Sequence, residues 1–334
     1  LCGGESVKNP TFELGRELTV SASGTLANGL TVSFDDKIDL TASENGDDWE
    51  LGFEGAFGKM LFRLGGSAVD DMLAGTDGSG ADVLGEEITG GHVSGTAGVD
   101  EVNVTYYAPS MGGLDLAIGY NQSTAAVGGS GLLLNDDTAY QDTFSIGMGY
   151  SMAVSDMTLT LGGGFENASV STTDCNTLVQ DLAAAELVAA ADADGAEDFT
   201  NALYGSAVCG DQSLVAIGGD LEMGSITLSG AYSNLDSDGA DQTVWSAGLG
   251  TTVGDISYLI GYTVEDQTFA RKNADGNSVG NEARIIMAEA STALGDGVDL
   301  AVNFSSNTVD KMSQELGGGS TTAWRAGVVV TVGF

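Results

Sequence analysis

Basic residues are scarce in this sequence. The 334 residues include 48 Asp and Glu but only 10 Lys and Arg, which gives a formal net charge of -38. A chain with this charge repels phosphate, so nucleic acid is excluded as a partner. Only 17% of the residues are charged. The negative charge therefore reflects missing bases more than a high density of acids.

Proline is nearly absent, and long apolar runs are missing. Two prolines against 51 glycines favour long strands joined by tight turns, because strand ladders use nearly every backbone N–H. The sequence contains no run of about 18 apolar residues that would form a membrane-spanning helix. Intrinsic disorder is disfavoured, since a disordered chain does not carry 42% hydrophobic residues with 11 Phe, 9 Tyr and 3 Trp.

Histidine occurs once, as His92 in GGHVSG, where we expect a loop residue. Lipase and protease sites need a nucleophile with a neighbouring base, and His92 is the only imidazole available. The glycine-rich GGGSTT at 317–322 lacks a P-loop lysine and leads into a predicted strand instead of a helix. We therefore expect no enzymatic activity and no catalytic metal.

The three cysteines are Cys2, Cys175 and Cys209. An odd number leaves at least one thiol unpaired or paired outside this chain. Cys175 and Cys209 flank one segment, so they can form a loop disulfide in an oxidising compartment. The alternative is a pair of inert thiols.

Apolar and polar residues alternate along the whole chain in segments of about ten residues, the length of a tilted membrane strand. In WELGFEGAF, for example, Trp49, Leu51 and Phe53 face away from Glu50 and Glu54. The polar face of these segments consists mainly of Thr, Ser, Gly, Ala and acids. Fifteen strands are predicted, at 12–24, 30–42, 48–56, 59–66, 101–108, 114–122, 141–151, 156–168, 213–223, 225–235, 241–253, 255–266, 281–294, 298–309 and 321–334.

The connections between these strands alternate in length. Short turns such as LANG, AFGK and SMGG are each followed by a longer polar connection, the longest being residues 67–99, 123–140 and 169–212. An antiparallel meander with short turns at one end and long loops at the other is typical of an outer-membrane barrel. A soluble β-sandwich also alternates, but its inner face is the apolar one. We therefore predict an all-β fold, a transmembrane antiparallel β-barrel that forms one domain over residues 1–334.

The connection at 169–212 departs from strand character. It is rich in Ala and places Leu178, Leu182, Leu187 and Val188 at helical spacing. We expect an extracellular insertion with a short helix that packs over the mouth of the barrel. A recognition element for a partner is the alternative.

Three stretches resemble the general bacterial porins, especially those of α-proteobacteria: FELGRELTVSASGTLANGLTVSFDD, GFEGAFGKMLFRLGGSAVDDMLAG and VNVTYYAPSMGGLDLAIGYN. The resemblance implies a 16-stranded barrel in the bacterial outer membrane, a homotrimer, and passive diffusion of small hydrophilic solutes. It also implies contact with outer-membrane lipid and lipopolysaccharide. The aromatic end of the chain resembles the family's assembly signal, which makes Phe334 the residue that the barrel-assembly machinery reads.

The strand count has a topological consequence. A barrel with an even number of strands has both chain ends on the periplasmic side. With Phe334 placed there, the first of the fifteen visible strands begins outside, and residues 1–11 fall in an external loop. We therefore expect one further strand before Leu1, absent from this sequence, as the possible location of a partner for Cys2.

In porins the loop between the fourth and fifth of these strands folds inward and narrows the lumen, which assigns that place to residues 67–99. Carboxylates in such a passage attract cations and repel anions. By alternation, several bases on the wall face this loop, although Glu17 stands where the family often has arginine. The predicted constriction acids are Asp70, Asp71, Asp77, Asp82, Glu86 and Glu87, and the predicted wall bases are Lys37, Lys59, Arg63 and Arg325.

Each of these interpretations has an alternative. The loop acids can be an ordinary solvated surface, and Lys59 and Arg63 can form cross-strand salt bridges with Glu50 and Glu54. No cofactor is expected, except that the acidic loop sequences ENGDD, DSDGAD and NDD offer oxygen ligands for Ca²⁺ without matching a complete calcium motif. The expected function is a cation-preferring diffusion channel; the alternatives are a substrate-specific channel and a structural or surface-layer β protein.

Overall fold

The structure is a computed structural model that describes residues 17–39, 48–64, 66–76, 102–122, 140–170, 211–237, 240–272, 278–295, 297–310 and 321–332. These residues form one sheet of 15 strands and one short helix. The elements are β1 (Glu17–Thr25), β2 (Thr31–Asp39), β3 (Asp48–Gly55), β4 (Gly58–Leu64), α1 (Ala68–Met72), β5 (Val102–Tyr107), β6 (Leu114–Gln122), β7 (Tyr140–Val154), β8 (Met157–Val170), β9 (Gln212–Met223), β10 (Ile226–Ser237), β11 (Ala240–Val253), β12 (Ile256–Lys272), β13 (Ser278–Gly295), β14 (Val298–Asp310) and β15 (Thr321–Val332).

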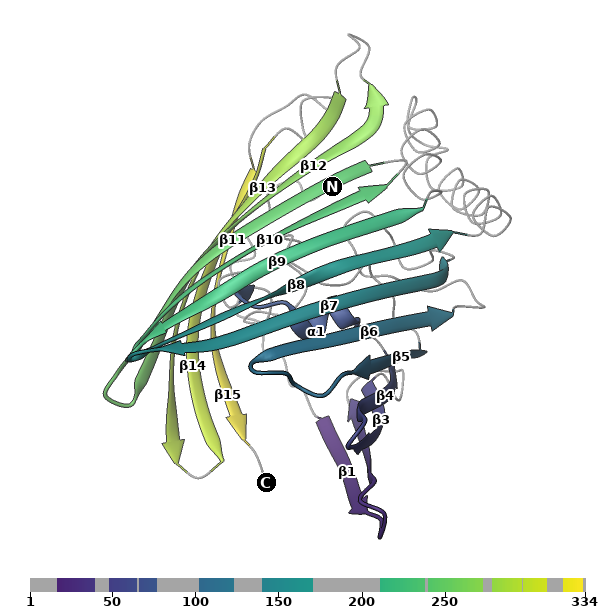
Figure 1. The fold of residues 1–334 in the computed structure, drawn as a ribbon. Coiled ribbons are helices and arrows are strands. Elements are labelled where there is room, and N and C mark those ends of the chain that lie inside the picture. Colours follow the sequence, from purple (N-terminus) through teal and green to yellow (C-terminus); the bar gives the residue numbers. More distant parts are fainter. Residues whose placement is uncertain are drawn as a thin grey trace.

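The strands follow one another in the sheet in chain order, each antiparallel to the next. This meander of 15 strands confirms the predicted antiparallel barrel class. Within the described residues the sheet is not closed, and β1 and β15 form its two edges. Figure 1 shows the sheet curving strongly around a central space, with α1 on its concave side. A sixteenth strand stays a prediction.

The short turns lie where the sequence predicts them. β7 and β8 are joined by Ser155 and Asp156, and β11 and β12 by Gly254 and Asp255. Both turns need a left-handed backbone conformation, with φ of 59° at Ser155 and 64° at Gly254. Glycine adopts this conformation without a steric cost, which accounts for Gly254 in the second turn, whereas a serine adopts it in the first.

The exposure of the side chains along β7 is the reverse of that in a soluble protein. Phe144, Ile146 and Met148 are 46%, 42% and 55% exposed, whereas Thr143 and Ser145 are buried. At the far edge of the sheet, Trp324, Val328, Val330 and Val332 of β15 are exposed on the outer face, and Val329 on the opposite face is exposed as well. An apolar outer face with a polar inner face is the arrangement of a membrane barrel.

Two predicted loops are shorter than expected. The connection predicted from 267 to 280 is partly strand, because β12 continues to Lys272 and β13 begins at Ser278. The acidic DSDGAD sequence is partly strand as well, with Asp236 in β10 opposite Asp241 in β11. Polar residues can extend a strand where the neighbouring strand supplies partners for their backbone hydrogen bonds. Strand ends predicted from polarity alone therefore left these strands too short.

Candidate functional site

The concave face of the sheet carries the polar half of the alternation. Gly147 in β7 and Gly162 in β8 lie on this face, because the backbone of residues 68–74 runs directly against both of them. The register of the sheet extends this face from strand to strand: Gly149 stands opposite Asp115 and Gly162, and Gly162 stands opposite Gly218. Every residue in register with these positions therefore faces the same inner space.

A segment at residues 66–76, named here the inner segment, lies on the concave face and contains α1. Its helix begins where the Ser67 hydroxyl accepts hydrogen bonds from the backbone N–H groups of Val69 and Asp70, at 3.2 and 3.3 Å. Such a cap satisfies donors that the first helical turn leaves without partners. Ala68 and Val69 are 0% exposed. The helix contacts β6, β7 and β8.

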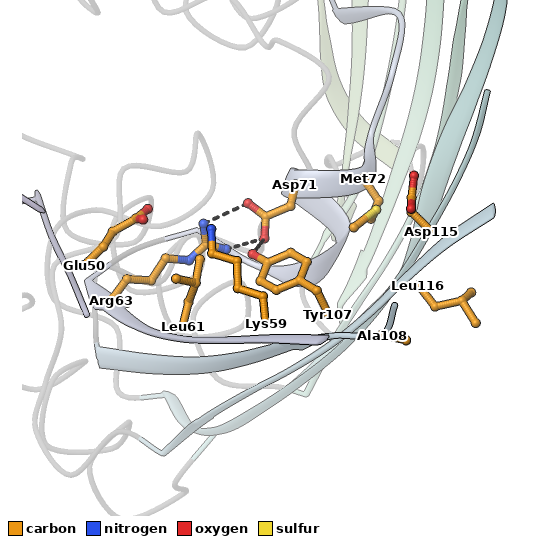
Figure 2. A pocket seen from close by; sticks show the side chains of 10 residues that line it. All are labelled: Glu50, Lys59, Leu61, Arg63, Asp71, Met72, Tyr107, Ala108, Asp115 and Leu116. Atoms are coloured by element: carbon orange, nitrogen blue, oxygen red, sulfur yellow. Dashed lines mark hydrogen bonds and ion pairs between the residues drawn. The ribbon is translucent and has the colours of Figure 1, made fainter. Parts of the chain in front are cut away.

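An ion pair joins the inner segment to the wall. Arg63 of β4 donates from Nη1 and Nη2 to the two carboxylate oxygens of Asp71, at 2.8 and 2.5 Å. The Tyr107 hydroxyl of β5 donates to Asp71 Oδ2 at 2.5 Å. Figure 2 shows these three side chains converging. A bidentate arginine–carboxylate pair fixes orientation as well as distance, and Arg63 is 8% exposed.

The sequence offered cross-strand salt bridges from Arg63 and Lys59 as an alternative, and the geometry of these two side chains bears on it. Arg63 stands opposite Glu50 in the ladder between β3 and β4, as expected for a cross-strand pair. Its guanidinium nevertheless forms its ion pair with Asp71. Lys59, opposite Glu54 in the same ladder, places its ammonium 5.7 Å from the centre of the Tyr107 ring, within the range of a cation–π contact.

These side chains surround a cavity of about 380 Å³ on the concave face. Both signs of charge line it, because β4 supplies the bases while β3, β6 and α1 supply acids (Figure 2). The cavity is lined by Glu50, Lys59, Leu61, Arg63, Asp71, Met72, Tyr107, Ala108, Asp115 and Leu116. The cavity therefore presents both signs of charge to a polar solute.

Further hydrogen bonds hold the inner segment along its length. The Asn103 side chain of β5 donates to the Gly66 carbonyl. The backbone N–H of Ala68 donates to Ser145 Oγ of β7 at 3.1 Å, and the N–H of Gly75 donates to Asp220 Oδ2 of β9 at 2.9 Å. The inner segment is therefore attached to strands from β4 to β9.

Acids outnumber bases on the concave face of the described strands. The bases at these positions are Lys37, Lys59, Arg63 and Arg325. The acids are Asp35, Glu50, Glu54, Asp115, Glu166, Asp220, Glu222, Glu265, Glu289 and Asp299. Since Arg63 is already paired with Asp71, acids are the predominant charged groups among these positions.

Two of these acids are deeply buried and were not predicted as site residues. Glu166 of β8 and Glu265 of β12 are each 1% exposed, and Gln242 Nε2 donates to Glu265 Oε1 at 2.7 Å. The signal for both was present in the sequence, because each occupies a polar-face position of an alternating strand. Asp220, whose carboxylate accepts a hydrogen bond from the Gly75 N–H, also occupies a polar-face position of an alternating strand.

The predicted site residues have different outcomes. Asp70 and Asp71 lie on α1, and Asp71 faces Arg63 as described above. Lys37 and Arg325 occupy concave-face positions, opposite Thr19 and Ser305. The other named residues lie outside the described residues: Asp77, Asp82, Glu86, Glu87, Phe334, Cys175 and Cys209.

The predicted insertion lies mainly outside the described residues. Its ends are strand, since β8 extends to Val170 and β9 begins at Gln212, while 171–210 are not described. ENGDD and NDD, two of the three acidic sequences proposed to bind Ca²⁺, also lie largely outside the described residues. In the described part of the chain, no three His, Cys, Asp or Glu side chains group closely enough to hold a metal ion. None of the helices described is long and apolar enough to span a membrane.

Comparison with solved structures shows the fold. OmpT of Vibrio cholerae with loop L8 deleted is 14% identical, with a TM-score of 0.59 over 97% of this chain and 93% of that one. An anion-selective porin from Comamonas acidovorans is 15% identical, with a TM-score of 0.56 over 95% and 88%. The outer-membrane channel DcaP of Acinetobacter baumannii is 12% identical, with a TM-score of 0.60 over 95% and 84%.

Comparison of the sequence with curated proteins found no match. The family model described as Gram-negative porin, however, matches residues 3–312, nearly the whole chain. The match agrees with the apolar outer face, the polar concave face and the inner segment. The chain belongs to the Gram-negative porin family and is an outer-membrane channel, not an enzyme.

Proposed function

We propose that this porin forms a water-filled pore that prefers cations among small hydrophilic solutes and ions. The observation that carries the preference is the excess of acids on the concave face, from Asp35 in β2 to Asp299 in β14. Fixed carboxylates beside a water-filled passage raise the local concentration of cations and lower that of anions. Passive diffusion itself is the function of the family.

Residues 67–99 form the constriction in this proposal. The contacts of the inner segment with the concave face support this assignment, because they keep the described part of the connection on the concave side of the sheet. Asp71 is neutralised by Arg63, so in this proposal the acids predicted at positions 77, 82, 86 and 87 supply negative charge. Lys37, Lys59 and Arg325 are further bases on the wall.

The fold does not determine which ion a porin prefers. The neighbour from Comamonas acidovorans is described as anion-selective, although its fold matches this chain with a TM-score of 0.56. Selectivity must therefore come from side chains on the inner face. The formal charge of -38 and the acids of the concave face favour cations here.

We propose a homotrimer as the working unit. One solved form of OmpT from Vibrio cholerae, 13% identical with a TM-score of 0.59, is described as a trimer. The exposed apolar face of the sheet offers surface for neighbouring subunits, outer-membrane lipid and lipopolysaccharide. The barrel-assembly machinery would recognise Phe334 at the end of the chain.

Recording in planar lipid bilayers tests the selectivity. The purified protein is placed between unequal KCl solutions, and the voltage at which the current vanishes is measured. We expect a reversal potential of the sign that indicates K⁺ over Cl⁻. A preference for chloride would contradict the proposal, and a current blocked by one solute at low concentration would favour a substrate-specific channel.

A further inference from the structure

The inner segment lies unusually close to the wall at three glycines. A Cβ atom on Gly147 would lie 1.9 Å from the Ala68 carbonyl oxygen, and one on Gly162 would lie 1.8 Å from that of Met72. A Cβ on Gly218 would lie 1.9 Å from the Ala74 carbonyl oxygen. All three obstacles are backbone atoms, which cannot turn aside as the end of a side chain does.

The segment cannot avoid such a methyl group by sliding along the wall. Ser145 holds the Ala68 N–H, the ion pair between Arg63 and Asp71 holds the helix, and Asp220 holds the Gly75 N–H. These attachments come from β4, β7 and β9, and they fix the segment along its length. The direction that remains open is away from the wall, toward the centre of the pore.

We propose that Gly147, Gly162 and Gly218 are positioning residues that determine how closely the inner segment lies to the wall, and thereby the free cross-section of the pore. The proposal rests on the proposed role of residues 67–99 as the constriction. It adds that the width of the pore depends on glycines in the strands behind the inner segment as well as on the charged side chains that face the pore.

The chain provides a matched control on the same strand. Gly149 lies two residues beyond Gly147 and faces the same side, but a Cβ there would lie 3.4 Å from Met72 Sδ and 3.9 Å from Asp115 Cβ. These are ordinary van der Waals separations from side-chain atoms. Alanine is better than glycine within a strand, so no intrinsic strand penalty is added at either position.

The test compares Gly147→Ala and Gly162→Ala with Gly149→Ala in the full-length chain. Single-channel conductance is measured in planar bilayers, and the entry of neutral sugars of increasing size is measured in vesicles. Moving the Ala68 oxygen from 1.9 Å to an ordinary 3.4 Å contact pushes the segment inward. We expect lower conductance and a lower size limit for Gly147→Ala and Gly162→Ala, with Gly149→Ala unchanged.

Conductance equal to or above that of the unsubstituted protein in both variants would overturn the proposal. Where a variant does not fold, the same substitution is combined with a flexible Gly-Ser segment of equal length in place of residues 68–76. Recovery of folding would support a collision with the inner segment, and continued failure would overturn it.

The outcome is distinguishable from failure of the proposed function. Lack of cation preference in the unsubstituted channel would remove the proposed selectivity but leave the comparison of current sizes intact. If the Gly-Ser replacement alone leaves conductance unchanged, the inner segment is not the constriction, and the proposed pore architecture fails before the glycines are considered.

Discussion

At the scale of single residues, Arg63 and Asp71 join the wall of the sheet to the inner segment. Their bidentate contact is partly removed from water, with side chains 10% and 21% exposed. Breaking such a pair is costly because the remaining charge loses its partner in a place where water replaces it poorly. Asp71 thus contributes structure and neutralises Arg63, whereas its neighbour Asp70 on the same helix is not part of this ion pair.

Asp71→Asn should weaken cation preference more than Asp70→Asn does. Both variants remove one negative charge from α1, but Asp71→Asn also leaves the positive charge of Arg63 without its ion-pair partner. The reversal potential in a KCl gradient measures the difference. Equal shifts for the two variants would show that the ion pair does not screen Arg63 in the pore.

A charge on the apolar face of β7 should destabilise the protein, whereas the same charge on the polar face should not. Ile146→Lys places an ammonium on the outer face near the middle of the strand, at a cost of about 2–4 kcal/mol if it lies at the bilayer midplane. Ser151→Lys adds the same group to an exposed inner-face position of the same strand. Urea-dependent folding in lipid vesicles measures both free energies. Similar values would contradict the assignment of the two faces.

At the scale of elements, α1 has one turn beyond its cap and depends on contacts outside itself. A five-residue helix is not stable alone, so the Ser67 cap and the packing of Ala68 and Val69 against the wall maintain it. Removal of either contribution should therefore loosen the inner segment while the strands remain intact.

Ser67→Ala should accelerate amide hydrogen exchange at Val69 and Asp70, the two N–H groups that donate to its hydroxyl. Loss of a capping oxygen costs about 0.5–2 kcal/mol. Ser67→Thr keeps the oxygen and is expected to exchange as the unsubstituted protein does. Equal protection of these amides in Ser67→Ala would show that the wall contacts hold the helix without the cap.

The strands could be predicted from the sequence, but the attachment of the inner segment could not. Period-two alternation is local, so segments such as the one around Phe53 disclose their own strand and face. The bond from Ala68 to Ser145 spans 77 residues, and the bond from Gly75 to Asp220 spans 145. Such partners are determined by the register of intervening strands, which no single segment records. The strands of the β12–β13 hairpin were predicted, but their ends at 267–272 and 278–280 were assigned to a loop because these residues are largely polar.

At the scale of the whole molecule, selectivity is a property of the summed field over the concave face. Individual acids such as Glu50 and Asp220 lie on different strands and at different depths. Their fields overlap only where mobile ions do not screen them. The Debye length is about 10 Å at 0.1 M salt and about 3 Å at 1 M.

Cation preference should therefore decline as salt concentration rises. Reversal potentials measured at one fixed concentration ratio, first around 0.1 M and then around 1 M KCl, should give a smaller K⁺ to Cl⁻ permeability ratio at high salt. A ratio that does not change would indicate that ions are selected by close contact at a dry filter instead of by the field of the wide face.

The outward direction of Phe144, Ile146 and Met148 has a consequence for handling the protein. A soluble globular protein buries most of its apolar residues in its interior and needs only water around it. This chain exposes apolar residues on its outer face. It therefore needs a second solvent, which is either a bilayer or a belt of detergent that covers the length of its strands. Its solubility is therefore a joint property of the polypeptide and the amphiphile chosen for it. Diluting the detergent below its micelle concentration should precipitate the protein while its internal hydrogen bonds are still formed.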